Sequence, residues 1–212
     1  MVDKRIQIIS QTTTPEYPDS NEPDAEDLYE EEIKTIKNQL RQWNKDLTKV
    51  KNSEYIKLKP TSNLFVWNVL LRAKPEQQAL WGTNWYRAQL VFFKGFPVKG
   101  PELRFPKRFK NLFVYTIASC NICYSSLNDW KETDTLTSVL PGVIEVLFED
   151  PELELNDLGF AVLKKAGLSG VAPANPELAK TFIKNRAEYD QIIRDQVATA
   201  SYSTEDLGFT EL

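Results

Sequence analysis

The clearest indication of fold class comes from residues 63–93, which read NLFVWNVLLRAKPEQQALWGTNWYRAQLVFF. A run of branched and aromatic residues stands at each end of this stretch, and Lys74-Pro75 and Gly82 supply turn signals between the two runs. A weakly alternating run precedes the stretch, and a short run follows Pro101. Consecutive strands with short connections are typical of an antiparallel meander. We therefore expect four strands, at residues 53–58, 63–72, 86–94 and 102–105.

A helix is predicted before the strands. Over residues 27–50 apolar side chains recur every three or four positions, which places them on one helix face. Asp27 suits the N-cap, with Glu30 three positions later as in a capping box. The opposite face carries a row of basic side chains, which is usually just a solvated surface. These are Lys34, Lys37, Arg41 and Lys45.

After the strands the pattern is first irregular and then helical. Residues 112–123 are apolar without a period, and we expect an extended loop across the surface. A helix is expected from Thr135 onward, beginning or kinking at Pro141, because proline is poor in a helix interior. Glycines predict an inserted loop at residues 157–174, with a helical turn at residues 160–165.

The last helix has the clearest start. Asn175 is the expected cap, Pro176 occupies the first helical position, and apolar residues recur to Val197. Helices segregated on one side of an antiparallel sheet make an α+β domain.

Charge divides the chain into a tail and a body. The first 32 residues hold ten acids and two bases, whereas the whole chain has a net charge of only −4. An acidic, proline-broken stretch cannot bury enough surface to fold alone. We expect a disordered or partner-bound tail at residues 1–26, one domain at 27–200 and a polar tail at 201–212. The acidic tail either keeps the protein soluble or docks on a basic partner or on the chain's own basic body.

Composition excludes several classes of protein. The chain has 212 residues, 42% of them hydrophobic, and no apolar run long enough to span a membrane. The basic excess of the body is small and scattered, so no nucleic-acid partner is expected. Two Cys and no signal-peptide pattern favour an intracellular, cytoplasmic setting, with the nucleus or an organelle-associated assembly as alternatives. The chain has no His, which removes Ser-His-Asp and Cys-His catalysis.

Four segments, taken in order, carry a resemblance. Residues 63–67 form a strand with a central Trp67, and residues 96–105 read FPVKGPELRF. Ile122-Cys123 is followed by Trp130, and residues 175–189 form the start of the last helix. Together they resemble the ubiquitin-conjugating enzyme family, whose Tyr-Pro-x-x-x-Pro-x-x-x-Phe element matches the second segment in spacing. The resemblance implies a helix, a four-stranded meander, a catalytic loop and further helices.

The resemblance covers about residues 27–198 and implies that Cys123 is the thioester cysteine, because the spacing to Trp130 selects it over Cys120. In the family this thiolate accepts ubiquitin or a related modifier from an activating enzyme and passes it to a lysine. One alternative is an inert buried thiol. Another is a Cys-x-x-Cys redox or zinc site, for which zinc would need two further Cys or His ligands that the chain lacks. No metal and no cofactor are expected.

The chain departs from the family pattern near the expected catalytic centre. The family's His-Pro-Asn element should lie about eight residues before the cysteine, where residues 113–116 read FVYT. Thr116 is the closest occupant of the Asn position. That Asn is proposed to stabilise an oxyanion, and such a donor is worth about 10²–10³-fold in rate. Glu154 is the candidate for the acidic residue that helps to deprotonate the incoming lysine.

The surfaces that the family offers to its partners are changed in one place and kept in another. Val98 replaces a Phe, and Glu132 stands where the family often has Ser-Pro-Ala, which would weaken the docking of a standard ligase. The basic face of the first helix lies where family members contact the activating enzyme, so it is a candidate for that interface.

Two functions remain open. We expect a non-catalytic or weakly active variant that serves as a binding module or as a structural subunit of a larger complex, because of the acidic tail, the insertion and the altered ligase patch. The alternative is an active conjugating enzyme with a thioester on Cys123, because one of only two Cys falls at the family's position. Its partners would then be an activating enzyme and a ubiquitin-like modifier.

Overall fold

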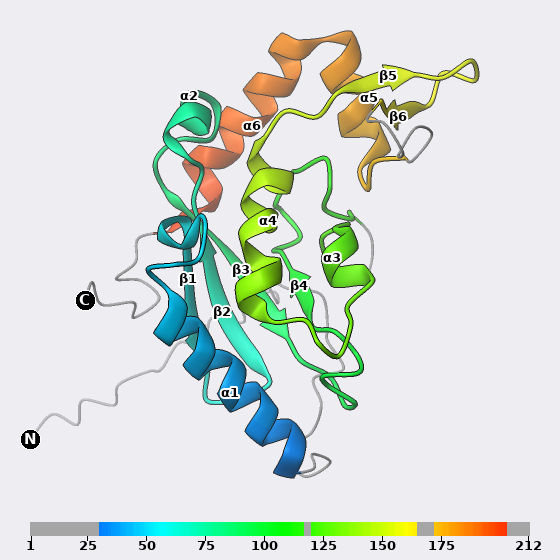
Figure 1. The fold of residues 1–212 in the computed structure, drawn as a ribbon. Coiled ribbons are helices and arrows are strands. Elements are labelled where there is room, and N and C mark those ends of the chain that lie inside the picture. Colours follow the sequence, from blue (N-terminus) through cyan, green and yellow to red (C-terminus); the bar gives the residue numbers. More distant parts are fainter. Residues whose placement is uncertain (1–29, 117–119, 165–171, 203–212) are drawn as a thin grey trace, which may run out of the picture.

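The computed structural model describes residues 30–116, 120–164 and 172–202. Its centre is an antiparallel meander in the order β1-β2-β3-β4 (Figure 1), which confirms the predicted α+β class. In register, Val69 lies between Leu58 and Ala88. The strand bounds are Ile56–Pro60 (β1), Val66–Leu71 (β2), Trp85–Val91 (β3) and Glu102–Arg104 (β4).

A fifth strand joins this sheet from the C-terminal end of the chain. β7 (Ser201–Tyr202) pairs with Trp85 and Tyr86, at the end of β3 that β4 does not cover. The stretch predicted as a polar tail at residues 201–212 therefore starts as part of the sheet, and its remainder lies outside the described residues, as does the predicted acidic tail at residues 1–26.

Two helices, α1 (Glu30–Asp46) and α4 (Leu136–Phe148), cover one face of the sheet (Figure 1). Ile36 and Trp43 of α1 are buried in the core, as the 3.6-residue period predicts. The side chain of Gln39 accepts a hydrogen bond of 2.9 Å from the backbone amide of Leu136. This bond satisfies one of the amides that a helix start leaves without an intrahelical partner. The predicted cap Asp27 lies outside the described residues.

Helix α4 begins where the helical pattern from Thr135 predicts. Its first residue is Leu136, five positions before Pro141, so of the two alternatives at the proline the one in which the helix begins there is wrong. Thr135 caps it, and its side chain accepts a hydrogen bond of 3.2 Å from the amide of Ser138. Pro141 lies inside the helix, where its carbonyl accepts a hydrogen bond of 3.1 Å from the Asn52 side chain.

The connection from β2 to β3 holds short helical elements that the turn signals did not predict. They are η3 (Pro75–Gln77) and α2 (Gln78–Trp81), and a similar turn, η2 (Ser53–Tyr55), precedes β1. Trp81, the last residue of α2, is buried in the core. Gly82 follows with a φ of +69°, and a β-carbon there would lie 2.8 Å from Val197. Glycine is therefore required both by the backbone and by the close approach of the last helix.

The last helical segment is two helices and not one. α5 (Pro176–Lys184) and α6 (Arg186–Ala200) are separated by Asn185, whose backbone is not helical. The amide of Glu188 donates to the Asn185 side chain at 3.2 Å, so Asn185 caps the second helix. The predicted cap at Asn175 is confirmed, because its side chain accepts a hydrogen bond of 3.2 Å from the amide of Leu178.

The predicted inserted loop is partly a hairpin. β5 (Leu153–Leu155) pairs with β6 (Ala161–Leu163), so the helical turn predicted at residues 160–165 is wrong over its described part. Asn156 closes the turn by accepting hydrogen bonds from the amides of Leu158 and Phe160, at 3.1 and 2.9 Å.

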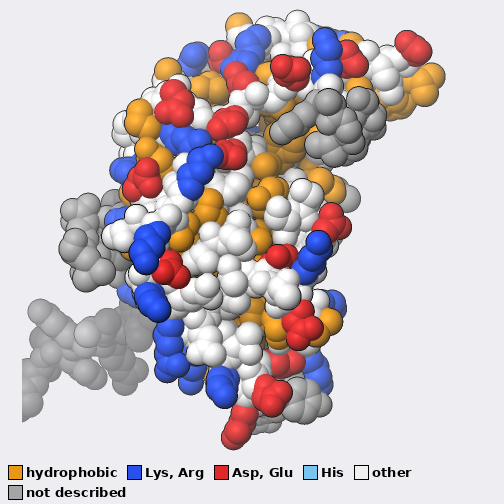
Figure 2. All heavy atoms as spheres, viewed as in Figure 1, with side chains coloured by type: hydrophobic (Ala, Val, Ile, Leu, Met, Phe, Trp, Pro, Cys, Tyr) orange, Lys and Arg blue, Asp and Glu red, His pale blue; other side chains and the backbone are white. Residues whose placement is uncertain are grey.

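Basic and hydrophobic side chains gather in different places on the surface seen in Figure 2. Lys and Arg side chains gather over α1, whereas hydrophobic side chains gather near the β5–β6 hairpin. At the hairpin tip Leu158 is 80% exposed and Phe160 is 54% exposed. Within the described residues, no helix combines the length and the apolar character needed to cross a membrane.

Candidate active site around Cys123

The chain around Cys123 is held from both sides. On one side, Phe105 and Ile122 donate backbone hydrogen bonds of 2.9 and 3.1 Å to the carbonyls of Cys120 and Leu103, which ties the segment to β4. On the other side, the amide of Cys123 donates to the carbonyl of Phe113 at 2.6 Å, and that of Tyr115 donates to Asn121 at 3.0 Å. Residues 120–123 therefore run as a short extra strand between β4 and residues 113–115.

Side chains alternate along this miniature ladder. Val114 and Ile122 form its central antiparallel bridge, and both are buried in the core. Their neighbours Phe113 and Cys123 point to the opposite face and are half-buried. The predicted loop across the surface is thus corrected, because its apolar side chains are core residues. Cys123 is half-buried, so it is not a fully buried thiol.

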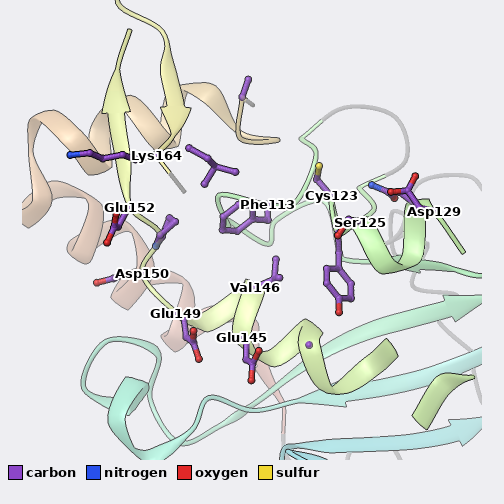
Figure 3. A pocket seen from close by; sticks show the side chains of 16 residues that line it. Phe113, Cys123, Ser125, Asp129, Glu145, Val146, Glu149, Asp150, Glu152 and Lys164 are labelled. Atoms are coloured by element: carbon purple, nitrogen blue, oxygen red, sulfur yellow. The ribbon is translucent and has the colours of Figure 1, made fainter. Parts of the chain in front are cut away.

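Cys123 borders a cleft of about 810 Å³. The cleft lies between the Cys123 loop, α3 (Ser125–Asn128), the end of α4 and the β5–β6 hairpin. Figure 3 shows Cys123 and Phe113 on one side of it and Asp150 and Glu152 on the other. The cleft is large enough to admit a side chain to the sulfur. Its carboxylates are Asp129, Glu145, Glu149, Asp150 and Glu152, and Lys164 is its cation.

Ion pairs fix some of these carboxylates. Glu145 lies 2.6 Å from Lys51, and this hydrogen-bonded cation lowers the pKa of the carboxyl group. Asp150 lies 2.8 Å from Arg186. Glu152 makes no ion pair with any described residue, so its charge stays available within the cleft.

Tyr115 lies near the cysteine. It is two residues after Phe113, on the face of the ladder that also carries Cys123. Hydrogen bonding and charge interaction with the Cys123 side chain raise the pKa of the Tyr115 phenol. The second cysteine differs, because Cys120 is buried and burial raises the pKa of its thiol. Cys120 also has a left-handed backbone, with a φ of 47°.

Trp130 joins two loops near the site. Its indole N–H donates a hydrogen bond of 2.9 Å to the carbonyl of Pro97. A β-carbon on Gly100 would lie 2.4 Å from the Trp130 β-carbon, so the two loops touch at this point. Val98 follows Pro97 and is 72% exposed, and Glu132 is exposed after Trp130. The structure thus brings together the two loops that carry these predicted partner-binding residues.

The other predicted residues do not line the cleft at Cys123. Thr116 is exposed, and its neighbour Tyr115 lies on the face of the ladder that carries Cys123. Glu154 is exposed on β5 and does not line the cleft, whereas Glu152 does. Lys34, Lys37, Arg41 and Lys45 are all exposed on α1, as predicted for its outer face.

Two residues were missed by the sequence analysis. Asn111 is buried, donates to the carbonyl of Leu147 at 2.7 Å and accepts from the amide of Phe113 at 2.8 Å. It therefore ties the end of α4 to the ladder that holds Cys123. Tyr115 could have been found by its distance of eight residues from Cys123, whereas no local pattern marks Asn111. No cluster of His, Cys, Asp and Glu among the described residues could hold a metal ion.

Comparison with known proteins identifies a family model and individual relatives that match this sequence. The family model described as ubiquitin-conjugating enzyme matches residues 35–157, more than half of the chain. The Sumo-conjugating enzyme ubc9 of Dictyostelium discoideum is 30% identical over 141 residues, which cover 63% of this chain and 72% of the relative. The ubiquitin-conjugating enzyme E2-34 kDa of Saccharomyces cerevisiae is 27% identical over 174 residues, which cover 74% of this chain but 52% of the relative.

Proposed function

The chain belongs to the ubiquitin-conjugating enzyme family, and we propose that it accepts a ubiquitin-like modifier as a thioester on Cys123. The observation that carries this proposal is the position of that thiol. It is half-buried at the edge of a cleft of about 810 Å³, on a backbone held by hydrogen bonds from both sides. A cysteine nucleophile must be accessible to react, and the thiolate is the reacting form.

The proposed loading step is a thioester exchange. The Cys123 sulfur attacks the carbonyl carbon at the end of the modifier while that carbon is bonded to a sulfur of the activating enzyme. A new carbon–sulfur bond forms, the old one breaks, and the electron pair leaves on the sulfur of the activating enzyme, which takes a proton from solvent. The cytoplasm and the nucleus keep such thiols reduced, so we assign the protein to one of these compartments.

The cleft supports a second step, transfer to a lysine. The lysine ammonium first loses a proton to solvent, and the neutral amine attacks the thioester carbon. A carbon–nitrogen bond forms, the pair of the broken carbon–sulfur bond returns to Cys123, and the nitrogen releases its excess proton to solvent. Glu152 and Asp129 lie in the cleft without an ion-pair partner among the described residues, so they can attract the lysine ammonium. Glu152 takes the place that the sequence assigned to Glu154.

The basic face of α1 is the proposed docking surface for the activating enzyme. Reversing Lys37 and Arg41 to Glu should abolish docking of the activating enzyme and with it the loading of Cys123. Both side chains are exposed, so the core should not be disturbed. The matched control is the same reversal at Lys184 and Arg194, two exposed positions on α5 and α6. Equal loading by the two double variants would refute the proposal that the activating enzyme docks on the basic face of α1.

The test of the function itself is a thioester assay. The purified chain is mixed with a panel of activating enzymes, their modifiers and ATP, and run on a gel without reductant. We expect a thiol-sensitive band that is lost in Cys123→Ala and kept in Cys120→Ala, since Cys120 is buried. Absence of the band with every modifier, from a folded protein, would overturn the proposal.

The second candidate is a non-catalytic binding module or subunit of a larger complex. It is favoured by the exposed Val98 and Glu132 at the family's ligase-binding positions, and by the absence of His from the chain. Deletion of residues 1–26 tests whether the acidic tail docks on a partner or only keeps the protein soluble. If the tail docks on a partner, its removal should weaken complex formation and leave the melting temperature unchanged.

A further inference from the structure

We propose that the β5–β6 hairpin is the docking surface for the target protein, which binds through a basic segment with an apolar side chain about four residues from the acceptor lysine. The proposal rests on the function proposed above, because it names the substrate class of the same cleft. The surfaces considered for the activating enzyme and for a ligase are on other elements, namely α1 and the loops of Val98 and Glu132.

The hairpin displays hydrophobic side chains to solvent. Among the described residues five large hydrophobic side chains are exposed, and three of these five belong to the hairpin and its tip (Figure 2). They are Leu155, Leu158 and Phe160. Exposed apolar side chains that gather in one place mark an interaction site, whereas single scattered ones do not. The tip therefore offers apolar contacts to another protein.

The tip is held in one conformation by Asn156. Its amide donates a hydrogen bond of 2.9 Å to the carbonyl of Phe160, and its carbonyl accepts one of 2.8 Å from Gly159. Directly after the tip, Ala161 is buried in the core, and the ammonium of Lys180 lies 6.0 Å from the centre of the Phe160 ring. A surface that is ordered before it binds loses little conformational freedom on binding.

The charge of the hairpin favours a basic partner. Residues 149–163 contain five acids and no bases. Ion pairs with Lys74 and Arg186 neutralise two of the acids. The other three are exposed and make no ion pair with any described residue; they are Glu152, Glu154 and Asp157. Lys164 stands opposite Glu152 and offsets one charge, so the hairpin keeps a negative excess that attracts a positively charged segment.

The hairpin joins the apolar tip to the cleft at Cys123. At its base, the amide of Lys164 donates a hydrogen bond of 2.9 Å to the carbonyl of Glu152, and both residues line the cleft. The tip begins at Asn156, four residues farther along, which is about 13 Å at roughly 3.3 Å per residue. A target that places its lysine amine at the sulfur in an extended segment thus lays a residue about four positions away over the tip.

The first experiment measures peptide binding to the full chain without a modifier, by fluorescence anisotropy. The probes are fluorescein-labelled peptides of Gly and Ser that carry two Arg, one Lys and one Phe, with the Phe placed one to eight positions from the Lys. Binding should be tightest at a spacing of about four. The double variant Leu158→Ser, Phe160→Ser should weaken it about tenfold or more, because apolar anchors carry most of the energy of an interface.

Leu47→Ser is the matched control, because it removes an exposed leucine just after α1, and it should bind as the parent does. Melting temperatures show that the variants are folded. No binding by any peptide, or equal binding by the parent and the double variant, would overturn the proposal. So would a mass in light scattering that rises with concentration in the parent and not in the double variant, because a second copy would then occupy the tip.

The second experiment measures discharge of the Cys123 thioester. The double variant should pass the modifier about tenfold more slowly to the tightest-binding peptide and at the parent's rate to free lysine, which needs no docking. Equal slowing with both amines would mean that the hairpin contacts the modifier, and would overturn the proposal. Peptide binding needs no thioester, so the two proposals fail separately. Binding without loading of Cys123 would reject the function alone, and loading without binding would reject the docking surface alone.

Discussion

The substitution Asn111→Ala tests how the site is anchored to the body of the protein. The Asn111 side chain satisfies two backbone groups at once, the carbonyl of Leu147 at 2.7 Å and the amide of Phe113 at 2.8 Å, and it is only 2% exposed. Alanine removes both hydrogen bonds and supplies no polar side chain to replace the amide of Asn111. Each buried group left unsatisfied costs about 1–3 kcal/mol, so the free energy of unfolding should fall by about 2–6 kcal/mol. That is a large part of the roughly 5–15 kcal/mol typical of a folded protein.

The assay is urea unfolding followed by tryptophan fluorescence. Asn156→Ala is the matched control, because its side chain also accepts from two backbone amides, those of Leu158 and Phe160, but on an exposed hairpin. Water can replace both bonds there, so the loss should stay below about 1 kcal/mol. Similar losses for Asn111→Ala and Asn156→Ala would refute the argument that burial makes the Asn111 bonds costly to lose.

Two further substitutions test contacts elsewhere in the fold. Gly100→Ala should lower the free energy of unfolding by about 1–3 kcal/mol, because its β-carbon would lie 2.4 Å from the β-carbon of Trp130, which cannot rotate away from the backbone; an unchanged urea midpoint would contradict this. Glu145→Gln should lower the melting temperature at pH 6. The hydrogen bond from Lys51 depresses the pKa of the Glu145 carboxyl group. The ionised carboxylate therefore stabilises the fold at pH values above its pKa in the unfolded chain, which is about 4.5. As the pH falls through the depressed value the parent loses this stabilisation, and the two melting curves should converge; a constant difference down to pH 2 would exclude the ion pair as its source.

The fold was largely predictable because its signals are local. Strand runs such as residues 63–72 are separated by Pro and Gly. The cap at Asn175 is indicated by the next residue, Pro176, which favours the first helical position. The errors have two causes, a tertiary contact that overrides a local preference and a local cap that the apolar period does not reveal. Pro141 is tolerated in α4 because that helix is packed against the core, and Asn185 breaks the last helix by capping its second half.

The candidate site was predictable only in part. Cys123 could be selected by its spacing to Trp130, but its neighbours depend on which side chains face the same way on a ladder. That alternation places Tyr115, and not Thr116, on the same face of the ladder as Cys123. Four of the five acids of the cleft, from Glu145 to Glu152, lie in α4 or just after it, distant from Cys123 in sequence, so no spacing rule could join them to the cysteine.

The two walls of the cleft differ in how they are built, and this has a consequence for how such a protein can diversify. The wall that carries Cys123 is bonded on both edges, to β4 and to residues 113–115, so a change of length there would displace the nucleophile. The opposite wall is the β5–β6 hairpin, whose tip projects Leu158 and Phe160 into solvent. Residues can be added to or exchanged in that hairpin without shifting the sulfur. One wall is thus held in place by hydrogen bonds along both edges, and the other ends in an exposed tip whose length is set by a single turn.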